Sequence, residues 1–307
     1  MTGPEASRAP LLALVGPTAA GKTELSLELA RRMGAEILSL DSMLVYRGMD
    51  VGTAKPSPAD RAAVRHHLID LVEPPEPYDV QRYLADAAAA EEAVAGRGAR
   101  PLFVGGTGFY LKSLLSGIHA GPPADLELRA ELERRWEPDR GAALHAELMA
   151  ADPQSGARIH PHDRKRVVRA HEIWRGTGRV PSASRTQWEA PARPSRLVGV
   201  RLEDRDLRGR IEARTRAMLA AGWIDEVRAI LDGSGFGPTS SQALGYPEVR
   251  EHLAGRLDRE QLAERINTRT WRFSRRQLTW YRRLGGVVWL DAATPNAIER
   301  ALGTLDG

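Results

Sequence analysis

The sequence of 307 residues contains no cysteine, and long apolar runs are missing as well. The absence of cysteine excludes disulfide bonds, zinc sites built from thiolates and a cysteine nucleophile. The first ten residues lack the apolar segment of a signal peptide, and no later stretch is long and apolar enough to span a bilayer. We therefore expect a cytoplasmic protein that has no membrane partner.

Lysine is scarce, so arginine supplies nearly all of the positive charge. The formal net charge is +4, and the chain has only four lysines, which are Lys22, Lys55, Lys112 and Lys165. Residues 156–186 hold eight basic residues against two acids, and residues 265–283 hold seven arginines and no acid. Such clusters are typical of a surface that binds a polyanion. For the second stretch, the solvated side of an amphipathic helix is the simpler interpretation.

Residues 16–23 read Gly-Pro-Thr-Ala-Ala-Gly-Lys-Thr, which matches the pattern G-x-x-x-x-G-K-T of phosphate-binding P-loops. The apolar run 11–15 before it has the length of a strand, and residues 24–33 after it carry the periodicity of a helix. A glycine-rich turn between a strand and a helix directs several backbone N–H groups at one point, which suits an anion. The alternative is a turn that binds nothing, and the flanking strand and helix argue against it.

The P-loop pattern assigns a function to this segment as a whole. The residues expected to cradle a polyphosphate are Gly16, Pro17, Thr18, Ala19, Ala20, Gly21, Lys22 and Thr23. Lys22 would reach the outer phosphate, and the hydroxyl of Thr23 would bind Mg²⁺, the one cofactor that we expect. The loop alone does not identify the polyphosphate, nor does it tell whether a phosphate is transferred or leaves.

Apolar runs and helical patterns alternate along the first third of the chain. Strands are expected at residues 11–15, 35–40 and 100–104, with helical patterns between them. This alternation predicts an α/β fold, a P-loop NTPase-like parallel sheet covered by helices. The P-loop, Asp41 and residues 105–107 each follow a strand directly, and ligands bind at the carboxyl ends of the strands in such sheets. We therefore expect these three segments to line one crevice.

The character of the sequence changes near residue 122. Three helical patterns follow, and no further strand is expected before residue 197. We interpret residues 123–195 as an all-helical insertion domain and assign residues 1–122 and 196–307 to the α/β core, in line with a length of about two domains. Within the second part of the core we expect a strand, two helices, a long helix over residues 259–284 and a last strand.

Residues 38–56 read Leu-Ser-Leu-Asp-Ser-Met-Leu-Val-Tyr-Arg-Gly-Met-Asp-Val-Gly-Thr-Ala-Lys-Pro. This block closely resembles the bacterial tRNA dimethylallyltransferase (isopentenyltransferase) family, and it is the most specific part of the resemblance. The other matching segments are Gly-Gly-Thr at residues 105–107 with Tyr110, Asp125 with Arg129, residues 158–169, Gly245 with Tyr246, and residues 276–280. The resemblance therefore covers essentially the whole chain.

The resemblance implies a reaction. Members of this family transfer the dimethylallyl group of dimethylallyl diphosphate to the exocyclic amine of the adenosine on the 3′ side of the anticodon in tRNA, and diphosphate leaves. The P-loop would then hold the diphosphate, with Lys22 neutralising its charge as the allylic C–O bond breaks. Asp41 matches the general base of the family, and Thr107 matches the threonine that orients the adenine. A further phosphate contact is implied for Arg210 or Arg214, between which the spacing does not decide.

The resemblance also implies where the anticodon stem-loop of tRNA binds. The implied contacts are Asp41, Ser42, Met43, Leu44, Thr107, Arg129, Lys165, Arg166, Val167, Val168 and Arg169. The family often has Gln-Arg-Leu where this chain has Lys165, Arg166 and Val167, so a phosphate contact would replace a hydrogen bond to a base edge. A place in the core is the alternative for Val167 and Val168. Ala20 stands where serine is common, with little expected effect because backbone amides do most of the binding.

Functions of two other classes stay open on the residues alone. An ATP-dependent kinase of a nucleoside or small metabolite would use the same P-loop and sheet, with the helical insertion as a lid. A nucleic-acid-binding module with a vestigial P-loop would explain the arginines, although the intact Lys22 and Thr23 argue against such decay. A GTPase is disfavoured because no Asn-Lys-x-Asp motif occurs.

Single side chains in the implied sites also have simpler interpretations. Asp41 can cap a helix or order Mg²⁺, and Thr107 can bond to its own turn. His160, His162 and His171 lack the i, i+4 spacing of two metal ligands on one helix, so we expect no transition-metal site there. The sequence leaves the oligomeric state open, and we expect a monomer.

Overall fold

The computed structural model describes residues 9–117, 125–184, 193–291 and 294–307. The chain divides into two compact units, one formed by Met1–Leu115 with Arg193–Gly307 and the other by Ser116–Ala192. The domain boundary expected at residues 122 and 123 lies outside the described residues, as does Arg185 of the first basic stretch. The first unit is called the core unit below, and the second is called the helical unit.

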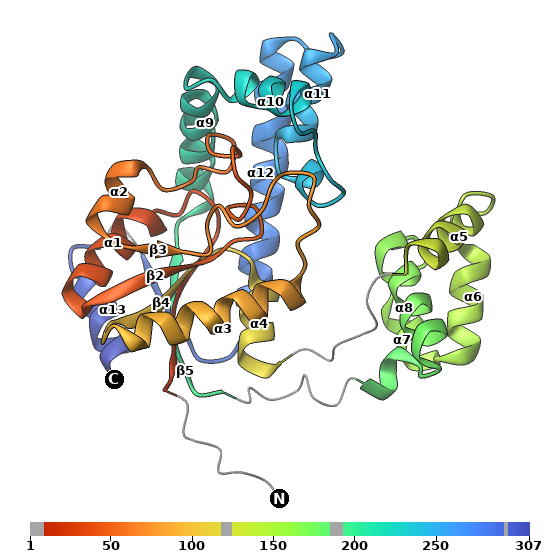
Figure 1. Cartoon of the computed structure of the whole chain (residues 1–307), viewed down its shortest axis with the longest axis horizontal. Coiled ribbons are helices and arrows are strands. Elements are labelled where there is room, and N and C mark those ends of the chain that lie inside the picture. The colour runs from red at the N-terminus through yellow and green to blue at the C-terminus, as the bar shows by residue number, and fades with distance from the viewer. Residues whose placement is uncertain (1–8, 118–124, 185–192, 292–293) are drawn as a thin grey trace, which may run out of the picture. The chain divides into compact units, whose positions relative to one another are not determined.

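A six-stranded parallel sheet forms the centre of the core unit (Figure 1), with the strand order β3-β2-β4-β1-β5-β6. The strands are β1 Leu11–Val15, β2 Ala35–Leu40, β3 His66–His67, β4 Arg100–Gly105, β5 Ser195–Arg201 and β6 Val287–Asp291. The predicted α/β fold with a parallel sheet is therefore confirmed. Because β4 lies between β1 and β2, the carboxyl ends of these three strands meet at one edge of the sheet.

The core unit contains the helices α1 Lys22–Met33, α2 Pro58–Ala63, α3 Val80–Gly96, α4 Gly108–Ser116, α9 Asp204–Ala220, α10 Trp223–Asp232, α11 Tyr246–Leu253, α12 Arg259–Tyr281 and α13 Ala297–Asp306. Of these, α1 and α13 pack on one face of the sheet, and α3 and α4 pack on the other. The long helix expected over residues 259–284 is α12, which ends at Tyr281 and packs along α9 (Figure 1). Four of the helices, α2, α4, α11 and α13, were not predicted.

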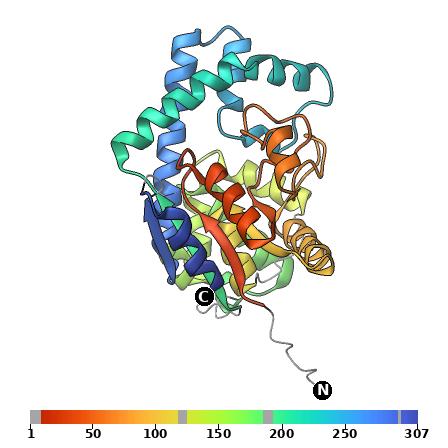
Figure 2. The same cartoon turned by 90° about the vertical axis from the view of Figure 1, so that its left-hand side faces the viewer.

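The two faces of the sheet bury different side chains, because successive residues of a strand point in opposite directions. In β1, Leu12 and Leu14 pack in one cluster with residues of α1 and α13. Leu11, Ala13 and Val15 pack in a second cluster with residues of α3 and α4. Figure 2 shows α1 and α13 side by side against the sheet. β1 is thus buried from both sides, which explains why it reads as a continuous apolar run.

The helical unit contains α5 Leu126–Trp136, α6 Ala142–Ala151, α7 Pro153–Arg158, α8 Arg164–Thr177 and a 3₁₀ turn at Pro181–Ser184. Its described residues include no strand, as expected, whereas α7 was not predicted. An aspartate accepts backbone N–H bonds at the start of α5, α7 and α8, which satisfies groups that a helix leaves without internal partners. A small separate core fixes the packing of these helices, with Leu132, Leu144 and Leu148 at its centre.

Across the described parts of the chain, every helix is too short or too polar to traverse a lipid bilayer.

We predict that Gly105→Ala lowers the free energy of unfolding by about 1–3 kcal/mol. A Cβ atom at this position would overlap the carbonyl oxygen of Leu40, where β4 lies against β2 at the edge that carries the site. The matched control is Gly209→Ala, because Gly209 lies exposed inside α9 with open space around it. The control should raise the free energy of unfolding by up to about 1 kcal/mol. Urea unfolding of both variants measures the difference, and equal stabilities would contradict the close approach.

Candidate active site

The P-loop of residues 16–23 lies between β1 and α1, as the pattern predicts. Gly16 and Gly21 have φ angles of 152° and 89°, which side-chain-bearing residues rarely adopt. A Cβ atom at Gly16 would lie 2.5 Å from the carbonyl oxygen of Val200 in β5, so the loop also needs glycine there for close packing. Ala20 is fully buried. The turn therefore has the glycine-dependent backbone shape that a P-loop requires before α1.

Lys22 is partly buried and bonds within its own loop. Its Nζ donates to the carbonyl oxygens of Gly16 at 3.0 Å and Pro17 at 2.7 Å. Thr23, the next residue, has an exposed side chain in the first turn of α1. The ammonium group is thus held at the loop that would receive a phosphate, and the next residue, Thr23, is exposed.

Two cations and one carboxylate act on one another at this edge of the sheet. Burial, followed by the nearby charge of Arg214, lowers the pKa of Lys22 from 10.5 to about 7, while Asp41 opposes the shift. Burial also lowers the pKa of Arg214, and Asp41 again opposes it. Arg210, which lies one turn earlier in α9, is exposed. Of the two arginines left open by the sequence, Arg214 is therefore the one beside Lys22 and Asp41.

Asp41 follows β2 directly and is only partly exposed. Its Oδ1 accepts a hydrogen bond of 2.8 Å from the backbone N–H of Met43, which fixes the orientation of the carboxylate. Tyr110 and Tyr281 lie close enough that the charge of Asp41 adds to the effect of burial, which raises the pKa of both phenols. The Tyr281 hydroxyl is buried without a hydrogen-bond partner among the described residues. The two phenols are thus within electrostatic range of this carboxylate.

Thr107 lies beside the same strand end. The backbone N–H groups of Gly106 and Thr107 donate to the carbonyl oxygen of Leu40 at 3.1 Å and 3.0 Å. Leu40 is the last residue of β2, so Thr107 and Asp41 are brought together by one carbonyl group. The structure therefore places Lys22, Asp41, Thr107 and Arg214 at one edge, as the spacing after the strands suggested.

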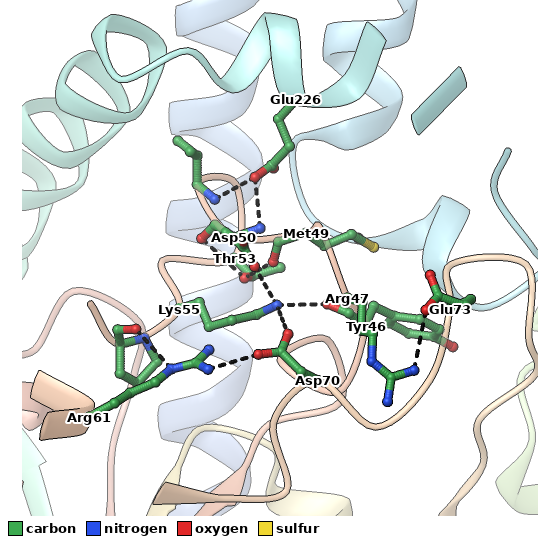
Figure 3. A network of polar contacts seen from close by, with 12 residues as sticks. Tyr46, Arg47, Met49, Asp50, Thr53, Lys55, Arg61, Asp70, Glu73 and Glu226 are labelled. Carbon is green, nitrogen blue, oxygen red and sulfur yellow. Dashed lines mark hydrogen bonds and ion pairs between the residues drawn. The ribbon is translucent and has the colours of Figure 1, made fainter. Parts of the chain in front are cut away.

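The long loop after Asp41 is fixed by a buried lysine (Figure 3). Lys55 is only 2% exposed, and its Nζ lies 2.5 Å from Asp50 and 2.6 Å from Asp70. It also donates to the carbonyl oxygen of Tyr46 at 2.7 Å, and Arg61 adds an ion pair to Asp70 at 2.8 Å. A buried charge is tolerated because it is paired and hydrogen-bonded on several sides.

A carboxylate from α10 holds the other side of this loop. Glu226 accepts hydrogen bonds from the backbone N–H groups of Asp50 and Val51 at 2.7 and 2.6 Å (Figure 3). It also accepts bonds from the backbone N–H of Gly52 at 3.1 Å and from the Tyr246 hydroxyl at 2.7 Å. A Cβ atom at Gly52 would overlap Trp223 and Tyr246. Much of the specific block at residues 38–56 therefore serves to shape the loop that begins with Asp41.

The basic residues of the helical unit fall into two groups. Arg129 and Arg169 both bond to Glu172, which is 2% exposed, with distances of 2.5 and 2.9 Å. Burial alone raises the pKa of Glu172, but its bonds to the two arginines outweigh burial and hold that pKa below its usual value. Lys165 and Arg166 are exposed on the first turn of α8.

The apolar and histidine side chains of this unit lie elsewhere. Val167 and Val168 are 0% and 5% exposed and belong to the core of the helical unit, so the structure corrects their assignment as side-chain contacts to tRNA. His171 is buried with Nε2 2.8 Å from the carbonyl oxygen of Leu144. His160 and His162 are exposed in the turn before α8. Among the described residues, no group of three or more His, Cys, Asp and Glu is arranged to hold a metal ion.

Comparison with protein families assigns almost all of the chain. The family model described as "IPP transferase" matches residues 44–284, and one described as "Isopentenyl transferase" matches residues 9–71. The chain belongs to the IPP transferase family. Among curated relatives, the tRNA dimethylallyltransferase of Symbiobacterium thermophilum is 44% identical over 95% of this chain and 92% of its own length. That of Roseiflexus castenholzii is 45% identical over 95% and 96%.

Solved structures give the same assignment. The tRNA isopentenylpyrophosphate transferase of Bacillus halodurans has a TM-score of 0.72 and 35% identity, with 97% of each chain covered. A eukaryotic dimethylallyltransferase described as acting on tRNA has a TM-score of 0.81 and 26% identity, with 95% of this chain and 77% of that chain covered. The family suggested by residues 38–56 is thus confirmed over the whole chain.

We predict that diphosphate binding weakens as the pH rises above about 7, because Lys22 then loses its proton in the free protein and must regain it to pair with the anion. The affinity of the wild-type protein relative to Lys22→Met should fall by up to about tenfold per pH unit between pH 7 and pH 9. Calorimetric titration of both proteins with inorganic diphosphate gives the ratio of the two affinities at each pH. The ionisation of diphosphate affects both proteins equally and therefore cancels in this ratio. A constant ratio over that range would contradict the assignment of Lys22 to the leaving group.

Proposed function

We propose that this enzyme transfers the dimethylallyl group of dimethylallyl diphosphate to the exocyclic amine of the adenosine on the 3′ side of the anticodon in tRNA. The proposal rests on one observation above all: Lys22, Arg214, Asp41 and Thr107 lie together at the carboxyl edge of the sheet. The family supports the same reaction, since its curated relatives are named tRNA dimethylallyltransferases.

The departure of diphosphate gives a function to the two cations, Lys22 and Arg214. The amides of the P-loop would bind the diphosphate at the start of α1. Lys22 and Arg214 would stabilise the negative charge that accumulates on it as the allylic C–O bond breaks, and they act strongly because both are partly removed from water. The exposed hydroxyl of Thr23 suits Mg²⁺, which prefers oxygen ligands and is often shared with substrate phosphates. Bound there, Mg²⁺ would add to the charge stabilisation of the diphosphate.

The attack by the adenine amine gives a function to the carboxylate of Asp41. An adenine amine is a weak nucleophile, so its proton must leave as the new N–C bond forms. Asp41 would accept that proton, with Oδ1 held by the Met43 amide and Oδ2 turned to the amine. Thr107 would orient the adenine from the neighbouring loop. The base must leave the stack of the anticodon loop to reach these groups, as it does in other enzymes that modify bases.

The anticodon stem-loop of tRNA is the proposed macromolecular partner. Ser42, Met43 and Leu44 are partly exposed beside Asp41 and would contact the RNA there. In the helical unit, Arg129, Lys165, Arg166 and Arg169 offer cationic groups to its phosphates. A monomer acting on tRNA in the cytoplasm stays our expectation. Neither the family models nor the relatives described above favour the kinase alternative.

We predict that the purified protein with Mg²⁺, dimethylallyl diphosphate and unmodified tRNA adds the mass of one dimethylallyl group to adenosine. Asp41→Asn should lower this turnover at least about 100-fold, because it removes the general base. Its affinity for inorganic diphosphate should be equal or higher, since a negative charge beside Lys22 is lost. Mass spectrometry of the digested nucleosides and calorimetry give the two values. Unchanged turnover in the variant would remove Asp41 as the base, and ATP consumption with no tRNA product would favour a kinase.

We further predict that the double variant Lys165→Ala/Arg166→Ala binds tRNA more weakly and with less dependence on salt. Loss of two phosphate contacts should reduce the slope of log K against log salt concentration by up to about 2. The matched control is Arg134→Ala/Arg140→Ala, which removes two exposed charges from the same unit. Binding measured across a salt series distinguishes them. Equal slopes for both double variants would place the RNA contact elsewhere.

A further inference from the structure

One buried side chain connects the two loops on either side of the proposed reaction. Gln277 of α12 is 7% exposed. Its Oε1 accepts a hydrogen bond of 2.9 Å from the backbone N–H of Thr18 in the P-loop, and its Nε2 donates one of 2.8 Å to the carbonyl oxygen of Gly106. Gln277 belongs to the segment 276–280, which resembles the family, and the sequence alone assigns it no function.

We propose that Gln277 is a positioning residue, which sets the separation between the loop that holds the diphosphate and the loop that carries Thr107. This inference rests on the proposed function, because the allylic carbon would be held from the first loop and the adenine from the second. The two reacting atoms must approach to about 3–3.5 Å before the bond forms, and small displacements from such a geometry cost much of the rate.

The chemistry of the bridge requires glutamine at this position. Thr18 offers an N–H donor and Gly106 offers a carbonyl acceptor, so the bridging group needs an acceptor and a donor a short distance apart. A carboxamide has both. Glutamate would offer an acceptor to each and would leave the Gly106 oxygen facing a second oxygen, and methionine would offer neither bond.

Close packing leaves little freedom around the bridge. A Cβ atom at Gly106 would overlap Nε2 of Gln277, and one at Gly108 would overlap the ring of Trp280 on the same helix. Ser274 Oγ donates to the carbonyl oxygen of Thr18 at 3.4 Å, so this P-loop residue is held by α12 at both its polar backbone groups. The positions of the P-loop and of the loop with Gly106 are therefore both fixed by contacts with α12.

The helix itself is well suited to serve as a fixed reference. α12 runs for 23 residues and begins with a capping box between Asp258 and Gln261. It packs along α9, which carries Arg214. The single helix α12 thus contacts both the P-loop and the loop that carries Thr107. Through its packing with α9, it also helps to position Arg214, the second cation proposed to bind the diphosphate.

The occupied amide of Thr18 has a measurable consequence. Because this N–H already bonds to Gln277, it is not free to bind diphosphate, and the anion depends on the other amides of the loop. Removal of the bridge should therefore leave diphosphate affinity almost unchanged while it slows the transfer step. A residue that only supported the fold would affect both together through loss of stability.

The test compares Gln277→Met, which has a similar length and no hydrogen bonds, with Leu262→Ala. Leu262 is buried in the main hydrophobic cluster near the start of the same helix, about 22 Å along its axis from Gln277, so its loss reports the effect of lower stability. Single-turnover transfer with saturating tRNA and dimethylallyl diphosphate gives the rate, calorimetry with inorganic diphosphate gives the affinity, and thermal unfolding gives the stability.

For Gln277→Met we expect a transfer rate about 10- to 100-fold lower, with a diphosphate affinity within about threefold of the wild type. Gln277→Glu should be slowed to a similar extent, because it loses the donor. Leu262→Ala should keep the wild-type rate at a temperature where it is folded. A wild-type rate in Gln277→Met, an equal loss of rate in Leu262→Ala, or a parallel loss of diphosphate affinity would overturn this inference alone. Absence of transfer by the wild-type protein would overturn the proposed function as well.

Discussion

The site depends on an arrangement of charges in which two partly buried cations, Lys22 and Arg214, act on the carboxylate of Asp41. Burial costs both cations part of their hydration, which makes each a stronger partner for an anion that enters. While Lys22 is protonated, one carboxylate cannot neutralise two cations, so a net positive charge is left at the place where a leaving diphosphate would develop negative charge. The carboxylate of Asp41 is also the group proposed to accept the proton of the adenine amine. The cluster of Lys22, Arg214 and Asp41 would therefore assist both the departure of diphosphate and the attack by the amine.

Much of this arrangement follows from local sequence. A strand followed by Gly-x-x-x-x-Gly-Lys-Thr determines the P-loop, and the strands before Asp41 and before residues 105–107 bring those segments to the same edge. Parallel pairing does this without any specific contact, because the carboxyl ends of the strands all point one way. The helices that were not predicted, α2, α4, α7, α11 and α13, are only 6 to 10 residues long. A short helix shows too few turns for its periodicity to be recognised.

The rest of the site could not be predicted, because it depends on packing between distant segments. Arg210 and Arg214 lie on the same side of α9, so periodicity cannot separate them, and only the packing of that helix decides which turn reaches Lys22. No local sequence pattern indicates the functions of Glu226 and Gln277. The backbone groups that these two side chains bond to are more than 170 residues away in the chain. In the helical unit, Val167 and Val168 show the opposite case: their apolar character already favoured the core, and the structure places them there.

The long reach of these contacts has a consequence for how the protein is made. Asp50 and Glu226 are 176 residues apart, and Thr18 and Gln277 are 259 residues apart. A ribosome releases the chain from its N-terminus, so the P-loop and the loop after Asp41 emerge long before the residues that fix them. The nascent N-terminal half must wait with exposed apolar strands until β5, α10 and α12 follow. A C-terminally truncated product would therefore contain the P-loop and Asp41 without Glu226 and Gln277, the side chains that fix these two loops.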